Sequence, residues 1–137
     1  MQSAEIRLHT GHRLVTDMTE AVVGFCVGKG DGLCHVFVPH ATAGVALMET
    51  GSGSEADLQQ AVDALLPRDG RYRHQHGSRG HGADHVLPAF VSPSLVLAVR
   101  DGRTVLGTWQ SVVFVDPNAD NPDRTVLLHF LADRSDP

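Results

Sequence analysis

Residues 32–44 read Gly-Leu-Cys-His-Val-Phe-Val-Pro-His-Ala-Thr-Ala-Gly, and this stretch is the clearest predictor of the fold. Its first half alternates with a period of two, which places Cys34, Val36 and Val38 on one face of a β-strand. The pentapeptide that starts at His40 is rich in small residues and predicts a turn. Because small residues let a ligand approach the backbone closely, the end of this strand is also the first candidate for a site.

The segments on either side predict one α+β domain over residues 1–137, with a mostly antiparallel sheet and two or three helices. Helices are expected over 17–28 and 54–66, each introduced by a capping box, and a further helical turn over 83–90. Strands are expected over 3–9, paired with 12–16, then over 45–49, over 95–99 and 103–115 as a hairpin, and over 124–131.

The bulk composition is that of a globular protein, with 42% hydrophobic residues and a formal net charge of −5. An acidic chain argues against generic binding of nucleic acid. The two cysteines, Cys26 and Cys34, form no Cys-x-x-Cys motif, so free thiols in a reducing compartment are expected. No signal peptide and no membrane-spanning stretch is recognisable, and the expected location is the cytoplasm, with no membrane partner.

The segment 67–82 carries the local exception to this acidic balance, with four arginines, four glycines and three histidines. A long segment without periodicity is usually either functional or disordered. Arg71, Arg73 and Arg79 can bind phosphate oxygens, although a solvated charged loop explains them equally well. A basic loop in an acidic protein suits a small anionic ligand.

Histidines are the strongest chemical signal in the chain. His74 and His76 lie two residues apart, and His81 and His85 share one face if residues 81–87 are helical. Together with His40, these residues supply enough nitrogen ligands for a zinc site. Two alternatives remain open: a hydrogen-bonded turn for His40, and solvated imidazoles for the loop.

Two acids are weighed as partners of this site, and three further residues are interpreted as structural. Glu49 and Asp84 are the acids nearest these histidines in sequence, and either could act as general acid/base, orient an imidazole or complete a metal shell. Trp109, the only tryptophan, shares strand parity with apolar residues and is expected in the core. His35 and His129 alternate with apolar neighbours and are interpreted as structural.

Taken together, the segments resemble the YjbQ-like proteins, also called the secondary thiamine-phosphate synthase family. The resemblance covers nearly the whole chain and rests on five short motifs in order: His40-Ala-Thr-Ala-Gly44 with Glu49, Tyr72-Arg73-His74, Asp84-His85 leading to Ser92-Pro93-Ser94, Leu106-Gly-Thr-Trp-Gln110, and Arg124. In one departure, the acid of Asp84 stands one residue closer to the histidine than is usual in the family.

The resemblance implies a YjbQ-like fold and a homotrimer with sheets packed about a threefold axis. It implies that His40, His74 and His85 gather in a pocket that holds an anion or a divalent metal, zinc or magnesium. The expected catalytic groups are Glu49 and Asp84. The residues expected to bind substrate or phosphate are Thr42, Arg71, Arg73, Gln110 and Arg124.

The activity that the resemblance implies is weak thiamine-phosphate synthesis. In this reaction a hydroxymethylpyrimidine diphosphate and a thiazole phosphate condense and release pyrophosphate. The expectation therefore leans towards an enzyme, a transferase that acts on small phosphorylated metabolites. The alternatives are a metal-dependent hydrolase of such a metabolite and a non-catalytic module that binds a metabolite or a metal.

Overall fold

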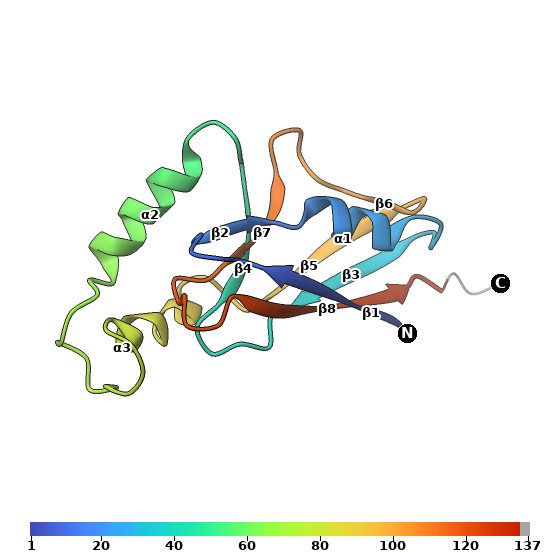
Figure 1. Cartoon of the computed structure of the whole chain (residues 1–137). Coiled ribbons are helices and arrows are strands. Elements are labelled where there is room, and N and C mark those ends of the chain that lie inside the picture. Colours follow the sequence, from blue (N-terminus) through green and yellow to red (C-terminus); the bar gives the residue numbers. More distant parts are fainter. Residues whose placement is uncertain (135–137) are drawn as a thin grey trace.

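The computed structural model describes residues 1–134 as a single α+β domain in which two antiparallel sheets pack face to face (Figure 1). The larger sheet has the strand order β1-β8-β3-β5-β6 and the smaller one β2-β7-β4. The strands are β1 (Gln2–His9), β2 (Val15–Asp17), β3 (Gly32–Phe37), β4 (Gly44–Met48), β5 (Ser94–Arg100), β6 (Arg103–Thr104), β7 (Ser111–Val115) and β8 (Asp123–Ala132). The helices are α1 (Thr19–Cys26), α2 (Ser54–Leu65), α3 (His81–Asp84) and the 3₁₀ turn η1 (Leu87–Ala89).

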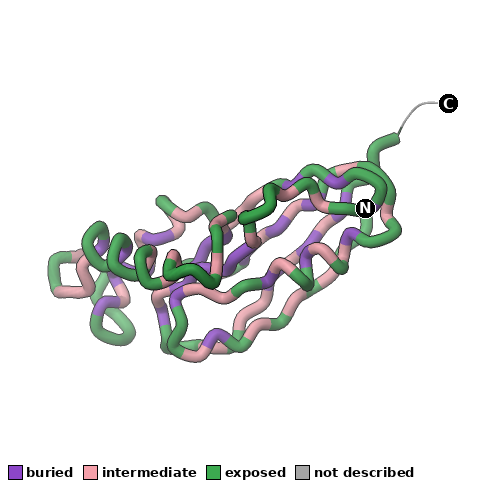
Figure 2. Tube along the Cα trace, turned by 90° about the horizontal axis from the view of Figure 1, so that it is seen from above, coloured by how far each residue is buried: buried purple, intermediate pink, exposed green. Residues whose placement is uncertain are grey.

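The main core lies between the two sheets and includes α1. The strand predicted from residues 32–38 directs Cys34, Val36 and Val38 into this core, and each is at most 1% exposed. Phe114 of β7 reaches the same core from the opposite sheet. Buried stretches run along the strands in the middle of the molecule, while the outer turns are exposed (Figure 2).

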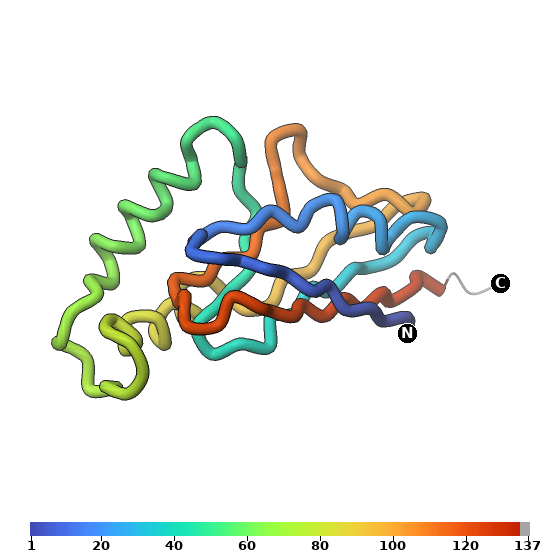
Figure 3. The backbone as a smooth tube through the Cα atoms, in the orientation of Figure 1, coloured from blue at the N-terminus to red at the C-terminus, as the bar shows by residue number. Residues whose placement is uncertain are grey.

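A second, smaller core lies on the other face of β7. Val113 and Val115 point there and pack against Val62 and Leu66 of the α2 segment and Leu87 of η1. Because β7 is covered on both faces, its sequence is a continuous apolar run rather than an alternating one. This second core attaches α2, α3 and the segment between them to one end of the domain (Figure 3).

The pairing of the strands differs from the sequence expectation in two places. The 12–16 segment does not pair with β1; β2 pairs with β7, and β1 pairs with β8 from Gln2↔Phe130 to His9↔Asp123. The expected 95–115 hairpin is limited to β5 and the two-residue β6, after which the chain crosses to the other sheet as β7. Both differences arise because burial of apolar faces across the domain outweighs pairing between neighbours in sequence.

Two local predictions are also corrected. Trp109 is 73% exposed rather than buried, because the 105–110 segment is a loop in which strand parity does not apply. Neither expected capping box forms as predicted: Asp17 accepts hydrogen bonds from the backbone N–H and the hydroxyl of Thr19, and Gly53 occupies the N-cap of α2. Across residues 1–134, every helix is too short or too polar to span a membrane.

Candidate functional site

Four histidine side chains converge on one point next to α3. His74, His76, His81 and His85 each offer a ring nitrogen, and these four atoms all lie within 4.8 Å of one another. We call this group the histidine quartet. His81 and His85 are held by α3, which places them one turn apart on the same face, as predicted from their spacing. His74 and His76 approach from the preceding loop, with ring centroids 4.0 Å apart.

Glycines permit this close approach. Gly82 lies within α3, and a Cβ built at this position would stand 2.6 Å from both the carbonyl oxygen of His74 and the Cβ of Tyr72. The 72–74 segment therefore packs directly on the helix backbone, which brings His74 to within 4.2 Å of His85 between ring centroids. Tyr72 is fixed in turn by a 2.8 Å hydrogen bond from its hydroxyl to the carbonyl oxygen of Pro67.

The surroundings favour neutral imidazoles in the quartet. Burial lowers the pKa values of His74 and His85, and the neighbouring histidines lower them further. Neutral imidazole is the form that binds metal ions. A cavity of ≈ 270 Å³ adjoins the group, and residues of the 69–82 segment line it, among them His74, His76, His81 and Arg79.

His81 is oriented by a partner that the sequence did not suggest. The side-chain amide of Asn118 lies 2.9 Å from Nδ1 of His81 and 3.1 Å from Oδ2 of Asp84. If the amide nitrogen donates to both, Nδ1 of His81 accepts, and Nε2 carries the proton that is directed at Nε2 of His85, 2.8 Å away. A ligand imidazole usually donates from its second ring nitrogen, so metal binding at Nε2 of His81 would require the proton on Nδ1, where Oδ2 of Asp120 lies 3.7 Å away.

Asp84 has a structural role in this arrangement. Its side chain is fully buried, and it pairs with Arg68 and accepts from Asn118. Burial raises the pKa of Asp84, against the opposing effect of Arg68. The carboxylate does not line the cavity, and of the roles expected for Asp84 its contacts fit the orienting one, exerted through Asn118 on His81.

His40 lies outside the quartet. Its Nε2 lies 2.9 Å from the carbonyl oxygen and 3.1 Å from the amide nitrogen of Thr125, and its Nδ1 lies 3.5 Å from Nη1 of Arg124. Burial lowers the pKa of His40. Of the three expected ligands, His74 and His85 therefore lie in the quartet, together with His76 and His81. The third, His40, lies in a second cluster.

This second cluster centres on the buried Asp116, which the sequence reasoning missed. Thr42 donates a 3.0 Å hydrogen bond to its Oδ1, and Nε of Arg124 lies 2.9 Å from Oδ2. Nε of Arg124 and Oδ2 of Asp116 do not have hydrogen-bond geometry, so their attraction is that of an ion pair. Burial raises the pKa of Asp116, opposed by the backbone N–H of Asn118 and by Arg124.

Residues 116–118 connect the two clusters. Oδ1 of Asp116 accepts from the backbone N–H of Asn118, whose side chain contacts His81. A continuous polar path thus runs from His40 and Arg124 through Asp116 and Asn118 to the quartet. In the sequence, this path is indicated by the polar tripeptide Asp-Pro-Asn directly after the apolar strand 112–115.

The remaining expected residues lie apart. Glu49 and Gln110 lie at one end of the β4–β7 ladder, next to the pair Met48↔Ser111. The second cluster lies at the other end of this ladder, next to the pair Gly44↔Val115. Gln110 closes its own loop by accepting from the backbone N–H of Gly107. Arg71 is engaged in a two-pronged contact with Asp69, while Arg73 is exposed.

A family model and a sequence relative both match this chain to the UPF0047 proteins. The family model described as UPF0047 protein YjbQ-like matches residues 4–133. A UPF0047 protein of Mycobacterium tuberculosis is 57% identical over 131 residues, covering 96% of this chain and 98% of the relative.

Solved structures agree with this likeness. A hypothetical protein of Aeropyrum pernix superposes with a TM-score of 0.87 at 31% identity, covering 97% of this chain and all of the other. A YbjQ-like protein of unknown function from Sulfolobus solfataricus, at 23% identity and a TM-score of 0.89 over 96% and 97% of the two chains, shows the same fold. None of these descriptions names a reaction.

Proposed function

Because the chain belongs to the UPF0047, or YjbQ-like, family, we propose that it is a metal-dependent enzyme acting on small phosphorylated metabolites. The observation that carries this proposal is the histidine quartet, whose four ring nitrogens lie within 4.8 Å of one another beside a cavity. The reaction to test first is thiamine-phosphate synthesis, the condensation of a pyrimidine diphosphate with a thiazole phosphate.

The donor set fits one type of metal better than another. Imidazole nitrogens suit Zn²⁺ and its neighbours in the transition series, whereas Mg²⁺ prefers oxygen ligands. Of the two metals expected, zinc is therefore the one we propose, with ligands from His74, His76, His81 and His85. Bound there, the metal would neutralise negative charge on phosphate oxygens. Asn118 would fix the orientation of His81.

Cations near the cavity are the second support for a phosphorylated ligand. Arg79 lines the cavity, and Arg73, directly before His74 in the sequence, is exposed. In this position they can bind phosphate oxygens and stabilise a departing diphosphate. Arg71 is the weaker candidate because Asp69 already occupies its guanidinium.

The size of the cavity favours a second candidate function. At ≈ 270 Å³ it is slightly below the usual range for small-molecule sites and holds one small phosphorylated molecule more readily than two. Hydrolysis of a single phosphorylated metabolite, with a metal-activated water, is the corresponding alternative. A binding module without turnover is the non-enzymatic alternative.

Metal content and product formation separate these functions. Protein dialysed against zinc is assayed for pyrophosphate release with both substrates and for phosphate release with each substrate alone, with and without chelator. We expect zinc to be retained at one ion per chain, and His81→Ala to lose both metal and turnover while His12→Ala keeps them. Retained zinc without product from any substrate would favour the binding module. Turnover that is unaffected by chelator and by His81→Ala would contradict the proposal.

The expectation of a homotrimer is kept as part of the proposal. Its support within the chain is a set of large apolar side chains at the surface, among them Trp109 at 73% and Val96 at 56% exposure. The mass of the particle in solution, measured by sedimentation, tests it: a species of three chains is expected at micromolar concentration, and a single chain would contradict it.

A further inference from the structure

Asp120 places its carboxylate beside the ring nitrogen of His81 that does not contact His85. Oδ2 of Asp120 lies 3.7 Å from Nδ1 of His81, whereas Nε2 of His81 faces His85. The same carboxylate oxygen accepts a 2.8 Å hydrogen bond from the hydroxyl of Ser78. The side chain of His81 is 15% exposed and that of Asp120 45%, so the carboxylate lies where the quartet meets solvent.

Metal binding reverses what His81 requires of its surroundings. Nε2 of His81 is directed into the quartet, where it lies 2.8 Å from Nε2 of His85. A metal ion binds this nitrogen through its lone pair, so a neutral imidazole must then carry its proton on Nδ1. Nδ1, which accepts in the metal-free form, becomes a donor. It then needs an acceptor, because a largely buried polar group is rarely left without a partner.

Asn118 cannot be that acceptor. The backbone N–H of Asp120 donates a 2.8 Å hydrogen bond to Oδ1 of Asn118, which identifies this atom as the amide oxygen. The amide nitrogen is therefore the atom that lies 2.9 Å from Nδ1 of His81, and it also donates to Asp84. Oδ2 of Asp120 is an acceptor near the same ring nitrogen, and a movement of about 1 Å brings Nδ1 within hydrogen-bond distance of it.

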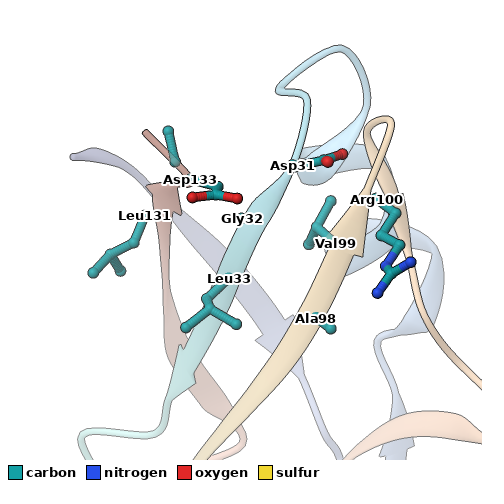
Figure 4. Close-up of a pocket in the computed structure, with 9 residues that line it drawn as sticks. Asp31, Gly32, Leu33, Ala98, Val99, Arg100, Leu131 and Asp133 are labelled. Carbon is teal, nitrogen blue, oxygen red and sulfur yellow. The ribbon is translucent and has the colours of Figure 1, made fainter. Parts of the chain in front are cut away.

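An acid beside a cavity is not by itself a partner for a metal site. Figure 4 shows a groove of ≈ 550 Å³ on the larger sheet, lined by Asp31, Asp133 and Arg100 among other residues. Of the residues within 1–134 that line this groove, none is a histidine. Asp31 instead accepts a 2.7 Å hydrogen bond from the backbone N–H of Asp101. These acids have no imidazole to orient, which distinguishes them from Asp120.

We propose that Asp120 is a positioning residue of the metal site. When a divalent metal binds the quartet, the carboxylate of Asp120 accepts the Nδ1 proton of His81 and holds this imidazole as a ligand through Nε2. The inference rests on the metal binding in the proposed function. His81 releases the proton of Nε2 and gains one on Nδ1, so the ring stays neutral and no proton is lost overall. Ser78 keeps its hydrogen bond, because a carboxylate has about four acceptor sites. A carboxylate behind a ligand imidazole fixes its tautomer and raises its basicity.

The position of the proton on His81 provides the first test. In protein with ¹⁵N-labelled histidine, long-range ¹H–¹⁵N NMR shows which ring nitrogen carries the proton, and His81→Gln identifies the signals of His81. At neutral pH we expect the proton on Nε2 without metal and on Nδ1 with zinc bound. In zinc-loaded Asp120→Ala the Nδ1 proton should exchange with water at least ~10-fold faster, since it has lost its acceptor. A proton that stays on Nε2 with zinc bound, or an exchange rate that does not depend on Asp120, would overturn the proposal.

Zinc affinity separates this role from a structural one. Asp120→Ala should bind zinc about tenfold more weakly, with circular dichroism to verify that it folds. Ser78→Ala removes the hydroxyl that shares the carboxylate of Asp120 and should bind zinc as the unaltered chain does. Asp123→Ala is the control for net charge, because it deletes an acid that contacts His9 outside the quartet, and it should also keep full affinity.

The other outcomes of this titration are equally specific. A loss in Ser78→Ala as large as that in Asp120→Ala would show that the carboxylate only supports the loop, and would overturn the proposal. Equal affinity in Asp120→Ala and Asp123→Ala would overturn it while leaving the metal site of the proposed function intact. If the unaltered chain binds no zinc, that metal site and the role of Asp120 fall together.

Discussion

His81 and His85 lie one helical turn apart with their Nε2 atoms 2.8 Å apart. At this separation the two nitrogens share one proton or bind one ion, because two protonated imidazoles would repel each other. His74 and His76 complete the same group from the loop, so four donors meet over a helix of only four residues. The quartet is thus held together by packing of the 72–82 segment rather than by a rigid helix.

The first prediction concerns metal binding. Zinc at about one hundred times its dissociation constant should raise the free energy of unfolding by about 2.7 kcal/mol, and the melting temperature by about 5 °C or more. Since proton and metal compete for the same nitrogens, the shift should shrink as the pH falls. Thermal unfolding with and without zinc measures it. His85→Ala should lose the shift and His12→Ala should keep it; an equal shift in both variants would place the metal elsewhere.

The second prediction follows from the contact of Gly82 with the 72–74 segment. Gly82→Ala forces Tyr72 and His74 away from α3, so stability should fall by about 1–3 kcal/mol and zinc affinity by about tenfold. Gly70→Ala is the matched control, because a Cβ at Gly70 meets no atom within 4 Å. Urea unfolding and zinc titration of the two variants decide the matter, and equal zinc affinity in both would show that the packing does not position His74.

The third prediction concerns the buried carboxylate of Asp84. Arg68→Ala removes its cationic partner and should cost about 3 kcal/mol at neutral pH, since a buried charge is left uncompensated. Burial already raises the pKa of Asp84, so the acid is protonated more readily in the folded than in the unfolded chain, and the loss should diminish as the pH falls towards this raised pKa. Unfolding free energies over a pH series measure this. Arg71→Ala, whose partner Asp69 has a side chain 42% exposed, should change little, and Arg68→Ala combined with Asp84→Asn should recover stability.

The sequence predicted the elements of this fold better than their partners. The strand at 32–38 and both main helices follow from periodicity, which is a local property. The pairing of Gln2 with Phe130 and the exchange of the chain between sheets after Thr104 depend on contacts remote in sequence. The site shows the same division. The spacing of His81 and His85 placed them on one face, whereas the separation of His40 from the quartet and the link through Asn118 required the packed structure.

Trp109 supplies the fourth prediction and a test of one corrected expectation. As the only tryptophan, at 73% exposure on the 105–110 loop, it should fluoresce in a single chain like an indole in water and be quenched freely by iodide. Trp109→Ala should change the free energy of unfolding of that single chain by less than about 0.5 kcal/mol. Dilution until sedimentation gives the mass of one chain provides the sample for this measurement. A blue-shifted, protected emission from that single chain would show that the loop folds back on the domain.

The last prediction concerns the path between the two clusters. Asn118→Ala removes the group that contacts His81 and Asp84, while Asp116 keeps Thr42 and Arg124 as partners. Because the contact with Asn118 fixes the ring orientation of His81, zinc affinity should fall by about 10- to 100-fold. Asn121→Ala is the control, since the side chain of this exposed residue accepts only from the backbone N–H of Asp123 among its contacts in residues 1–134. Zinc titration of both variants, with far-ultraviolet circular dichroism to verify the fold, separates positioning from unfolding. If Asn118→Ala folds and binds zinc as tightly as Asn121→Ala, then the packing against Gly82 alone orients the quartet, and the second cluster has no influence on the metal.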